Sequence, residues 1–279
     1  MMRICYAEED DRDFIRWTSN LLRTFLQSRS IQIVKQSEQP DLMLASIWRP
    51  HVFLDGVPVI LVTNENWRFF GPHFPLSRYK AVIGLYPPNV PCNFISFPLA
   101  AVHFNMPMPE LYLLRTKLLS RPKTKFCCFV TTNGNRGEYA EHRIKLFRAI
   151  NAWKPVDSAG SVENNTGWLA PLGLDFLYWI AQYKYMICLE NSFDPGYITE
   201  KPFQSWLAST VPIYDGGCAD QLNQAAIVNA GAINILGELQ RLENDPAAYA
   251  AKRQAELTDT SISLQEFERE FRRLVLETH

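Results

Sequence analysis

The 279-residue sequence lacks an excess of charge of either sign. Its 28 Lys and Arg residues almost balance 29 Asp and Glu residues, which gives a formal net charge of -1. Proteins that bind nucleic acid or an anionic membrane through a broad basic surface carry a clear positive excess, and this chain has none. We therefore expect no nucleic-acid partner, and an anionic ligand must be held locally by a few cationic side chains.

The sequence also lacks a long uninterrupted apolar run and a recognisable targeting segment. The longest stretch without Asp, Glu, Lys or Arg, residues 81–109, is repeatedly broken by proline, which a membrane-spanning helix does not tolerate at that frequency. The N-terminal residues run directly into four acidic residues at 8–11, unlike a signal peptide. These features predict no transmembrane segment and a soluble, cytoplasmic protein.

Cysteines in a metal-binding or disulfide-framework spacing are absent as well. The six cysteines are scattered, with no C-x-x-C pair and no zinc-type spacing to histidine. Cys127 and Cys128 are neighbours in an apolar run, where alternation along a strand would send them to opposite faces. We interpret the cysteines as small buried residues in a reducing compartment and expect no metal site.

The sequence does contain enough apolar material for a substantial core. Hydrophobic residues make up 47% of the chain, and at about 150 residues per domain the length favours two domains. In each half, short apolar runs typical of sheets covered on both faces alternate with helical segments. The predicted fold class is therefore α/β, with two Rossmann-like doubly wound domains facing a cleft.

The individual elements follow from this alternation. Strands are expected at 3–7, 31–34, 42–47, 57–62, 81–85 and 94–97, and again at 126–131, 185–189, 211–214 and 232–235. Helices are expected at 110–119, 138–151, 174–183 and 200–209, with one starting at Asp11 and one at a capping box at 263–266.

A polar, basic stretch at 120–125 is the best candidate for a domain boundary. We accordingly predict an N-terminal domain at 1–112, a linker at 113–125, and a C-terminal domain at 126–279 that ends in a helix.

The densest group of polar residues lies at 188–201, from the end of a predicted strand into the start of a predicted helix. Free backbone N–H groups at a helix start suit a phosphate or a sugar hydroxyl, with Thr199 or Tyr197 near the cap, and Lys201 adds a cation. An ordinary strand-to-helix turn with a surface Glu–Lys pair explains the same residues about as well. The other hydrogen-bonding side chains in this stretch are those of Glu190, Asn191 and Glu200.

The same stretch resembles the signature of a known enzyme family. The resemblance rests on Glu190-Asn191-Ser192, on residues 197–201 and on the proline-containing stretch 211–216, which together are similar to the α1,3/4-fucosyltransferases of glycosyltransferase family 10. Weaker similarity extends over 126–133, 142–143, 160–162 and 62–66. So many fixed residue types over this spacing make the signal specific.

The resemblance implies a GT-B fold and the inverting transfer of L-fucose from GDP-β-L-fucose to a hydroxyl of a GlcNAc-containing glycan. The expected acceptor is an N-acetyllactosamine-like end, with an α1,3-type linkage. The donor site would lie in the C-terminal domain. Residues similar to the family's donor contacts are Arg143, Asn191, Tyr197, Glu200 and Lys201, and Glu190 belongs to the same motif.

The resemblance also suggests a catalytic base and a metal-free mechanism. Glu65, just beyond the predicted strand 57–62, is similar to the glutamate that the family uses as base, although a surface turn is the alternative. No Asp-x-Asp at a strand end suggests a metal, so Arg143 and Lys201 would neutralise the pyrophosphate and no cofactor is expected.

Some features depart from the family. Asp215 stands where bacterial relatives tend to have an aromatic residue, and the segment 105–125 is short. The missing N-terminal anchor indicates a bacterial type of enzyme, cytoplasmic or peripheral to the inner face of the membrane. Two alternatives stay open: a GT-B glycosyltransferase that uses another nucleotide sugar, and a catalytically inactive nucleotide-sugar or glycan-binding protein.

Overall fold

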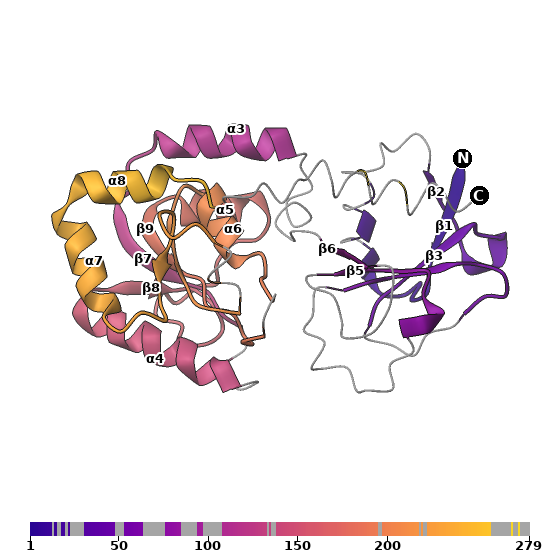
Figure 1. Ribbon diagram of the computed structural model, residues 1–279, viewed down its shortest axis with the longest axis horizontal. Helices are drawn as coiled ribbons and strands as arrows, with labels where there is room; N and C mark the ends of the chain where they lie inside the picture. Colours follow the sequence, from indigo (N-terminus) through magenta and orange to yellow (C-terminus); the bar gives the residue numbers. More distant parts are fainter. Residues whose placement is uncertain are drawn as a thin grey trace. The chain divides into compact units, whose positions relative to one another are not determined.

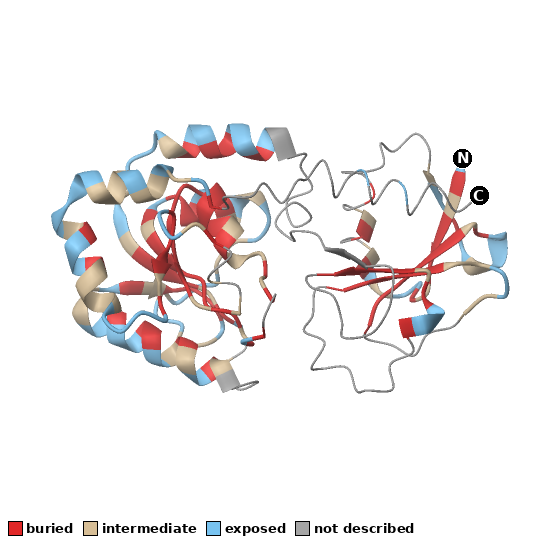
Figure 2. Cartoon of the chain, in the orientation of Figure 1, coloured by how far each residue is buried: buried red, intermediate tan, exposed pale blue. Residues whose placement is uncertain are grey.

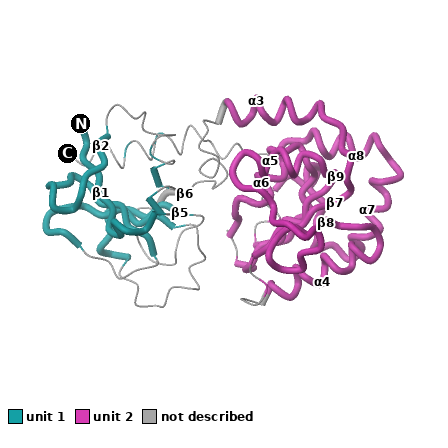
Figure 3. The backbone as a smooth tube through the Cα atoms, turned by 180° about the vertical axis from the view of Figure 1, so that it is seen from behind, with its two compact units in different colours: residues 1–107, 260–279 teal, residues 108–259 magenta. Residues whose placement is uncertain are grey.

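The computed structural model forms two compact units (Figure 3). Unit 1 comprises residues 1–107 and 260–279, and unit 2 comprises residues 108–259. The residues that the structure describes are 1–12, 14–15, 18–19, 22, 31–47, 53–63, 76–84, 94–96, 108–132, 134, 138–194, 197–217, 219, 222–257, 269 and 273.

Unit 1 is built around a parallel sheet in the order β2-β1-β3-β4-β5-β6 (Figure 1). The central strands β3, β4 and β5 are buried at every position, as expected for a sheet covered on both faces (Figure 2). The strands are β1 (Met2–Tyr6), β2 (Ile31–Ile33), β3 (Leu42–Ala45), β4 (Val59–Val62), β5 (Ala81–Gly84) and β6 (Phe94–Ser96). All six lie where the sequence predicts them.

The helix predicted from Asp11 begins as expected. The Asp11 carboxylate accepts a hydrogen bond from the backbone N–H of Phe14 at 2.9 Å, which is the geometry of an N-cap. Phe14 and Leu22, which follow in this segment, are buried. The acidic start of this segment therefore serves the helix, as the sequence indicates.

Unit 2 contains a second parallel sheet, in the order β11-β10-β9-β7-β8 (Figure 1). Helix α4 lies on one side of this sheet and α5 and α6 on the other, the arrangement of a doubly wound domain. The strands are β7 (Lys125–Phe129), β8 (Val156–Ser158), β9 (Tyr183–Ile187), β10 (Val211–Tyr214) and β11 (Val228–Asn229). The helices are α3 (Met108–Leu119), α4 (Glu138–Trp153), α5 (Leu174–Ile180), α6 (Lys201–Leu207), α7 (Ile235–Asn244) and α8 (Pro246–Gln254).

Both sheets have a point where the strand order reverses. In unit 2 the chain runs from β7 outward to β8, and then returns to the other side of β7 as β9. Unit 1 repeats this between β1 and β3. In open α/β sheets, ligands bind beyond the carboxyl ends of the strands at such a point. The topology therefore marks the ends of β7 and β9 as the binding edge of unit 2.

The predicted domain boundaries need correction. Residues 113–119 of the predicted linker form the second half of α3, which belongs to unit 2, and residues 260–279 group with unit 1. Leu111 and Leu118 on α3 are buried, and the Arg115 guanidinium lies 3.9 Å from the ring centroid of Trp206 on α6. The basic residues after α3 resemble a linker, but the apolar face of the helix ties it to unit 2.

Two further element predictions fail or stay untested. The strand predicted at 232–235 is wrong, because the last strand of the sheet is β11 and Ile235 starts α7. The Asn234 side chain accepts a hydrogen bond from the Gly237 N–H at 2.9 Å and so caps α7. The capping box predicted at 263–266 lies outside the described residues.

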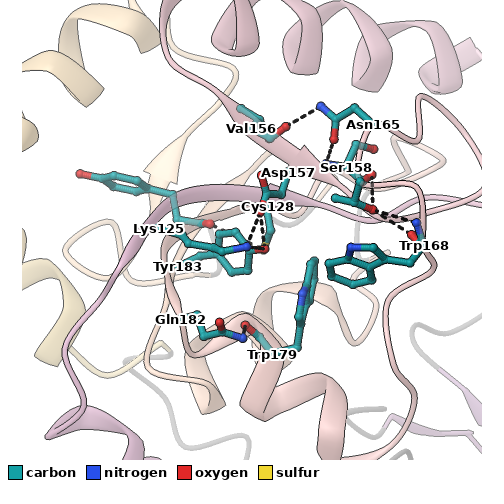
Figure 4. A network of polar contacts seen from close by, with 12 residues as sticks. Lys125, Cys128, Val156, Asp157, Ser158, Asn165, Trp168, Trp179, Gln182 and Tyr183 are labelled. Atoms are coloured by element: carbon teal, nitrogen blue, oxygen red, sulfur yellow. Dashed lines mark hydrogen bonds and ion pairs between the residues drawn. The ribbon is translucent and has the colours of Figure 1, made fainter.

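A polar network lies in the unit 2 sheet away from the carboxyl ends of its strands (Figure 4). The Asp157 carboxylate accepts hydrogen bonds from Lys125 Nζ and from the Tyr183 hydroxyl, both at 2.7 Å. Lys125 and Tyr183 are the first residues of β7 and β9, and Asp157 is the middle residue of β8, so this network joins three neighbouring strands. Because it lies away from the carboxyl edge, we assign it a structural role.

Candidate active site

The site in unit 2 is organised around one buried carboxylate at the carboxyl end of β9. Glu190, three residues beyond the strand, is only 2% exposed. Its carboxylate accepts hydrogen bonds from the Thr199 N–H at 2.8 Å, the Thr199 hydroxyl at 2.7 Å and Lys201 Nζ at 3.0 Å. Glu190 therefore joins the start of the 190–199 loop to its end and holds the lysine beside it.

Lys201 is the first residue of α6, and its ammonium is kept charged by its neighbours. Nζ donates to the Thr199 hydroxyl at 2.7 Å and lies 4.0 Å from a carboxylate oxygen of Glu200. Burial acts to lower the pKa of Lys201, but the carboxylates of Glu190 and Glu200 outweigh it and hold that pKa above its usual value. The site thus contains a stable positive charge.

Arg143 brings a second positive charge from α4, on the other side of the sheet edge. Its side chain is buried, and burial lowers the pKa of Arg143, partly offset by the charge of Glu190. The charges of Arg143 and Lys201 also act on one another. Two cations therefore converge around a single carboxylate at the point where the strand order reverses.

The other residues predicted for the donor site lie on the same loop. The Tyr197 hydroxyl donates to the Asn191 side-chain oxygen at 2.9 Å, and Tyr197 itself is buried. Glu200, which is half-buried, precedes Lys201 as the residue that flanks α6. Helix α6 starts one residue later than predicted, and no side chain that the structure describes caps it. The structure brings Glu190, Asn191, Tyr197, Glu200, Lys201 and Arg143 together.

A pairing at this edge is not visible in the sequence. His142 Nε2 and the Asp215 carboxylate lie 3.1 Å apart, which connects α4 with the end of β10. The Asp215 carbonyl also accepts a hydrogen bond from the Glu190 N–H at 3.1 Å. The sequence marks Asp215 only as a departure from the family pattern. The position of His142 directly before Arg143 is the one signal in the sequence that points to this pairing.

The glycine that follows Asp215 is required by the same geometry. A Cβ atom on Gly216 would lie 2.6 Å from the Tyr214 hydroxyl and 2.8 Å from Cγ of Glu190. Real Cβ atoms do not approach other heavy atoms so closely. The glycine that ends the proline-containing strand motif thus leaves the space that Glu190 occupies.

The predicted catalytic base, Glu65, lies outside the described residues, so its role stays a prediction. Among the residues that the structure does describe, no three His, Cys, Asp or Glu side chains are grouped to hold a metal ion. Four cysteines in this part of the chain, Cys5, Cys127, Cys128 and Cys188, are buried free thiols. None of the described helices has the length and apolar character needed to span a bilayer.

Comparison with known proteins finds similarity over the part of the chain that contains this site. Residues 120–249 match the family model of the C-terminal domain of glycosyltransferase family 10 (fucosyltransferase). The α-(1,3)-fucosyltransferase FucT of Helicobacter pylori is 36% identical over 109 residues, which cover 38% of this chain and 21% of that protein. The α-(1,3)-fucosyltransferase B of Drosophila melanogaster is 35% identical over 217 residues, covering 58% of this chain and 47% of that protein. The chain thus spans less than half the length of these curated relatives.

A solved structure supports the fold over the whole chain. The crystal structure of an α1,3-fucosyltransferase with GDP-fucose aligns with a TM-score of 0.72 and 21% identity, covering 98% of this chain and 90% of that one. This likeness confirms the predicted GT-B fold with two Rossmann-like domains. The region matched by the family model contains Arg143 and the whole 190–201 stretch. Residues 120–249 are thus similar to the C-terminal domain of glycosyltransferase family 10, the fucosyltransferase family.

Proposed function

We propose that this protein is an inverting fucosyltransferase, which moves L-fucose from GDP-β-L-fucose to a hydroxyl of a glycan acceptor. The observation that carries the proposal is the convergence of Arg143 and Lys201 at the strand-reversal edge of unit 2, where a di-anionic group can be bound. The match of residues 120–249 to the family 10 model and the names of the relatives and of the solved structure support fucose as the transferred sugar.

The two cations would act on the leaving group. When the bond between fucose C1 and the β-phosphate oxygen breaks, negative charge grows on the GDP diphosphate. Arg143 and Lys201 can take this charge in charge-assisted hydrogen bonds, each worth about 1.5–3 kcal/mol. Because the transition state carries more charge on the diphosphate than the bound donor does, these contacts favour bond breaking as well as binding. No metal is needed in this scheme.

Glu190 has a different role in the proposal from the direct donor contact that the motif suggests. Its carboxylate is buried and already accepts three hydrogen bonds, two from Thr199 and one from Lys201. We expect it to position Lys201 and to set the charge of its ammonium. Asn191, Tyr197 and Glu200 would order the ribose and the fucose through their polar atoms.

Glu65 would complete the reaction as general base. The acceptor hydroxyl loses its proton to the Glu65 carboxylate while its oxygen forms the new bond to fucose C1. Attack on the face opposite the departing GDP converts the β linkage of the donor into an α linkage in the product. A positioned base contributes about 10²–10⁴-fold to such a step. The expected acceptor is a GlcNAc-containing glycan of N-acetyllactosamine type, fucosylated in α1,3 linkage, in a bacterial cytoplasmic setting.

The proposal is tested in two steps on the full chain. Thermal unfolding is first compared in the presence of GDP-fucose, GDP-mannose and several UDP-sugars, and we expect GDP-fucose to stabilise the protein. GDP release is then measured with N-acetyllactosamine, with GlcNAc and without acceptor. Stabilisation by a UDP-sugar but not by GDP-fucose would assign another donor. Binding of GDP-fucose without acceptor-dependent GDP release would instead indicate a binding protein.

A further inference from the structure

The 190–199 loop presents its side chains in an unusual way. Ser192 and Asp194 are 8% and 7% exposed, while Phe193 between them is 42% exposed. The Ser192 hydroxyl donates to the Asp194 carboxylate at 2.8 Å, so the two polar neighbours are fixed inside the loop. Leaving apolar surface in water costs about 25 cal/mol per Å². The loop thus buries its polar residues and leaves a large part of its aromatic residue exposed.

The exposed ring is part of an aromatic pair beside the cations. Phe193 stacks on Tyr139, with ring centroids 5.3 Å apart and an interplanar angle of 21°. Tyr139 lies in the first turn of α4 and meets the edge of the His142 ring at 6.4 Å. Because Tyr139 precedes Arg143 by four residues, both lie on one face of the helix, about 6 Å apart along its axis.

The loop is also fixed near Phe193, which suits a binding surface. Glu190 is held by Thr199 and Lys201 on one side of it, and the Tyr197 N–H donates to the Asp194 carbonyl at 2.9 Å on the other. A ring that is held in place before binding loses little conformational freedom when a ligand stacks on it. The Phe193–Tyr139 pair is therefore a preformed aromatic surface about one helical turn from the proposed diphosphate site.

We propose that the Phe193–Tyr139 pair is the stacking surface for the purine base of the nucleotide donor. The inference rests on the proposed function, because it places the base relative to a diphosphate held by Arg143 and Lys201. One helical turn is comparable with the length of the ribose that separates the base from the diphosphate. The sugar hydroxyls need polar partners, and the loop offers those at Asn191 and Glu200 instead. A planar purine matches the flat face of the pair.

Calorimetric titration of the full chain with three ligands tests the inference: inorganic pyrophosphate, GDP and GDP-fucose. Loss of base stacking on alanine substitution weakens nucleotide binding by roughly ten-fold or more. Phe193→Ala should therefore weaken GDP and GDP-fucose by a similar factor and leave pyrophosphate unchanged. Phe193→Tyr should bind all three ligands as the native protein does. Leu172→Ala, at an exposed apolar residue away from the loop, is the matched control and should change none of the affinities.

The other outcomes each overturn the inference. Equal weakening of pyrophosphate and GDP by Phe193→Ala would show a distorted loop, and unchanged GDP binding would show that the base lies elsewhere. Weaker GDP-fucose with unchanged GDP would assign the pair to the sugar. Native protein that binds pyrophosphate as tightly as GDP would refute the stacking surface and leave the diphosphate site standing. Native protein that binds neither would refute the proposed function and this inference with it.

Discussion

At the scale of single residues, the site depends on how one buried carboxylate is shared. Glu190 would be costly as an isolated buried charge, but it lies against the Lys201 ammonium and two donors of Thr199. In return it keeps the pKa of Lys201 above its usual value. The cation that is proposed to bind the diphosphate is therefore maintained by a residue that need not touch the ligand.

Substitution of Glu190 by Gln should reveal, in the pH dependence of GDP binding, that the charge of Lys201 depends on Glu190. The amide keeps the side-chain shape but removes the larger of the two carboxylate charges that raise the pKa of Lys201, so that pKa is lower in the variant. A group whose folded-state pKa falls loses its proton at lower pH. The GDP affinity of Glu190→Gln, relative to that of the native protein, should therefore decline as the pH rises from neutral toward the usual pKa of lysine. The ionisation of GDP is common to both proteins, so the ratio of their dissociation constants isolates Lys201. A constant ratio across this range would contradict the positioning role.

The same residues show what the sequence could and could not predict. The motif located Arg143 and the 190–201 stretch because it consists of adjacent residue types at a fixed spacing. It could not show that Glu190 is buried or that His142 meets Asp215, since these follow from three strands and a helix converging at one edge. The open physical choice between a binding loop and an ordinary polar turn also needed the topology, because only the strand order places the loop at a reversal point.

At the scale of elements, strands that consist of apolar runs were predicted well. Elements that lie inside polar, loop-like stretches were missed. The predicted strand at 211–214 coincides with β10, and that at 42–47 contains β3. The short β8 was missed because Val156–Ser158 sits inside a polar, glycine-containing stretch. Helix α8 was missed although Asp245 caps it, accepting a hydrogen bond from the Ala248 N–H at 2.9 Å, with Pro246 in its first turn. The local cap signals of α8, Asp245 and Pro246, are therefore present in the sequence.

The connection after β8 depends on one glycine. A Cβ atom on Gly160 would lie 2.0 Å from the Thr131 carbonyl oxygen and 2.4 Å from its nitrogen, so the backbones beyond β7 and β8 approach too closely for any side chain. Gly160→Ala should lower the free energy of unfolding by about 3 kcal/mol or more in urea titration, because backbone must move. Gly167→Ala, where φ is +77° and no atom lies within 4 Å, should cost only about 1–2 kcal/mol. Equal costs for the two variants would contradict the close approach.

Helix α8 fastens the end of α3 to unit 2 through one guanidinium. Arg253 Nη2 donates to the carbonyls of Leu118 and Leu119 at 3.1 and 2.8 Å, and Nε donates to the Ser209 carbonyl at 2.9 Å. Arg253→Met removes these donors, although the Leu118 carbonyl still accepts from the Arg121 N–H at 3.2 Å, and should lower the free energy of unfolding by about 2–4 kcal/mol in urea titration.

The control for this change is Arg241→Met, which removes an exposed arginine from its ion pair with Glu238. Exposed pairs contribute little, so this variant should cost less than about 1 kcal/mol. A comparably small cost for Arg253→Met would mean that the apolar face of α3 and its Arg115, which donates to the Arg253 carbonyl at 3.1 Å, hold the helix without this guanidinium.

At the scale of the whole molecule, the near-zero net charge is consistent with cations that are placed locally in one of the two units. A formal net charge of -1 leaves no general attraction for anions. The structure places the cations locally, at one edge of unit 2, with Glu190 and Glu200 balancing them before the ligand arrives. Length and alternation predicted two α/β units correctly. They did not predict that α3 belongs to unit 2, because burial of a helix face cannot be read from the polar residues that follow it.

The central claim is that Lys201, at the carboxyl edge of the unit 2 sheet, holds the diphosphate of a nucleotide. Calorimetric titration of GDP into Lys201→Gln tests it most directly, because the glutamine amide can still donate to Glu190 and so keep the loop folded. Lys145→Gln, which removes an exposed lysine of α4, is the matched control. The account predicts that Lys201→Gln weakens GDP about ten-fold or more while Lys145→Gln leaves it unchanged. GDP affinity in Lys201→Gln equal to that of the native protein would contradict it.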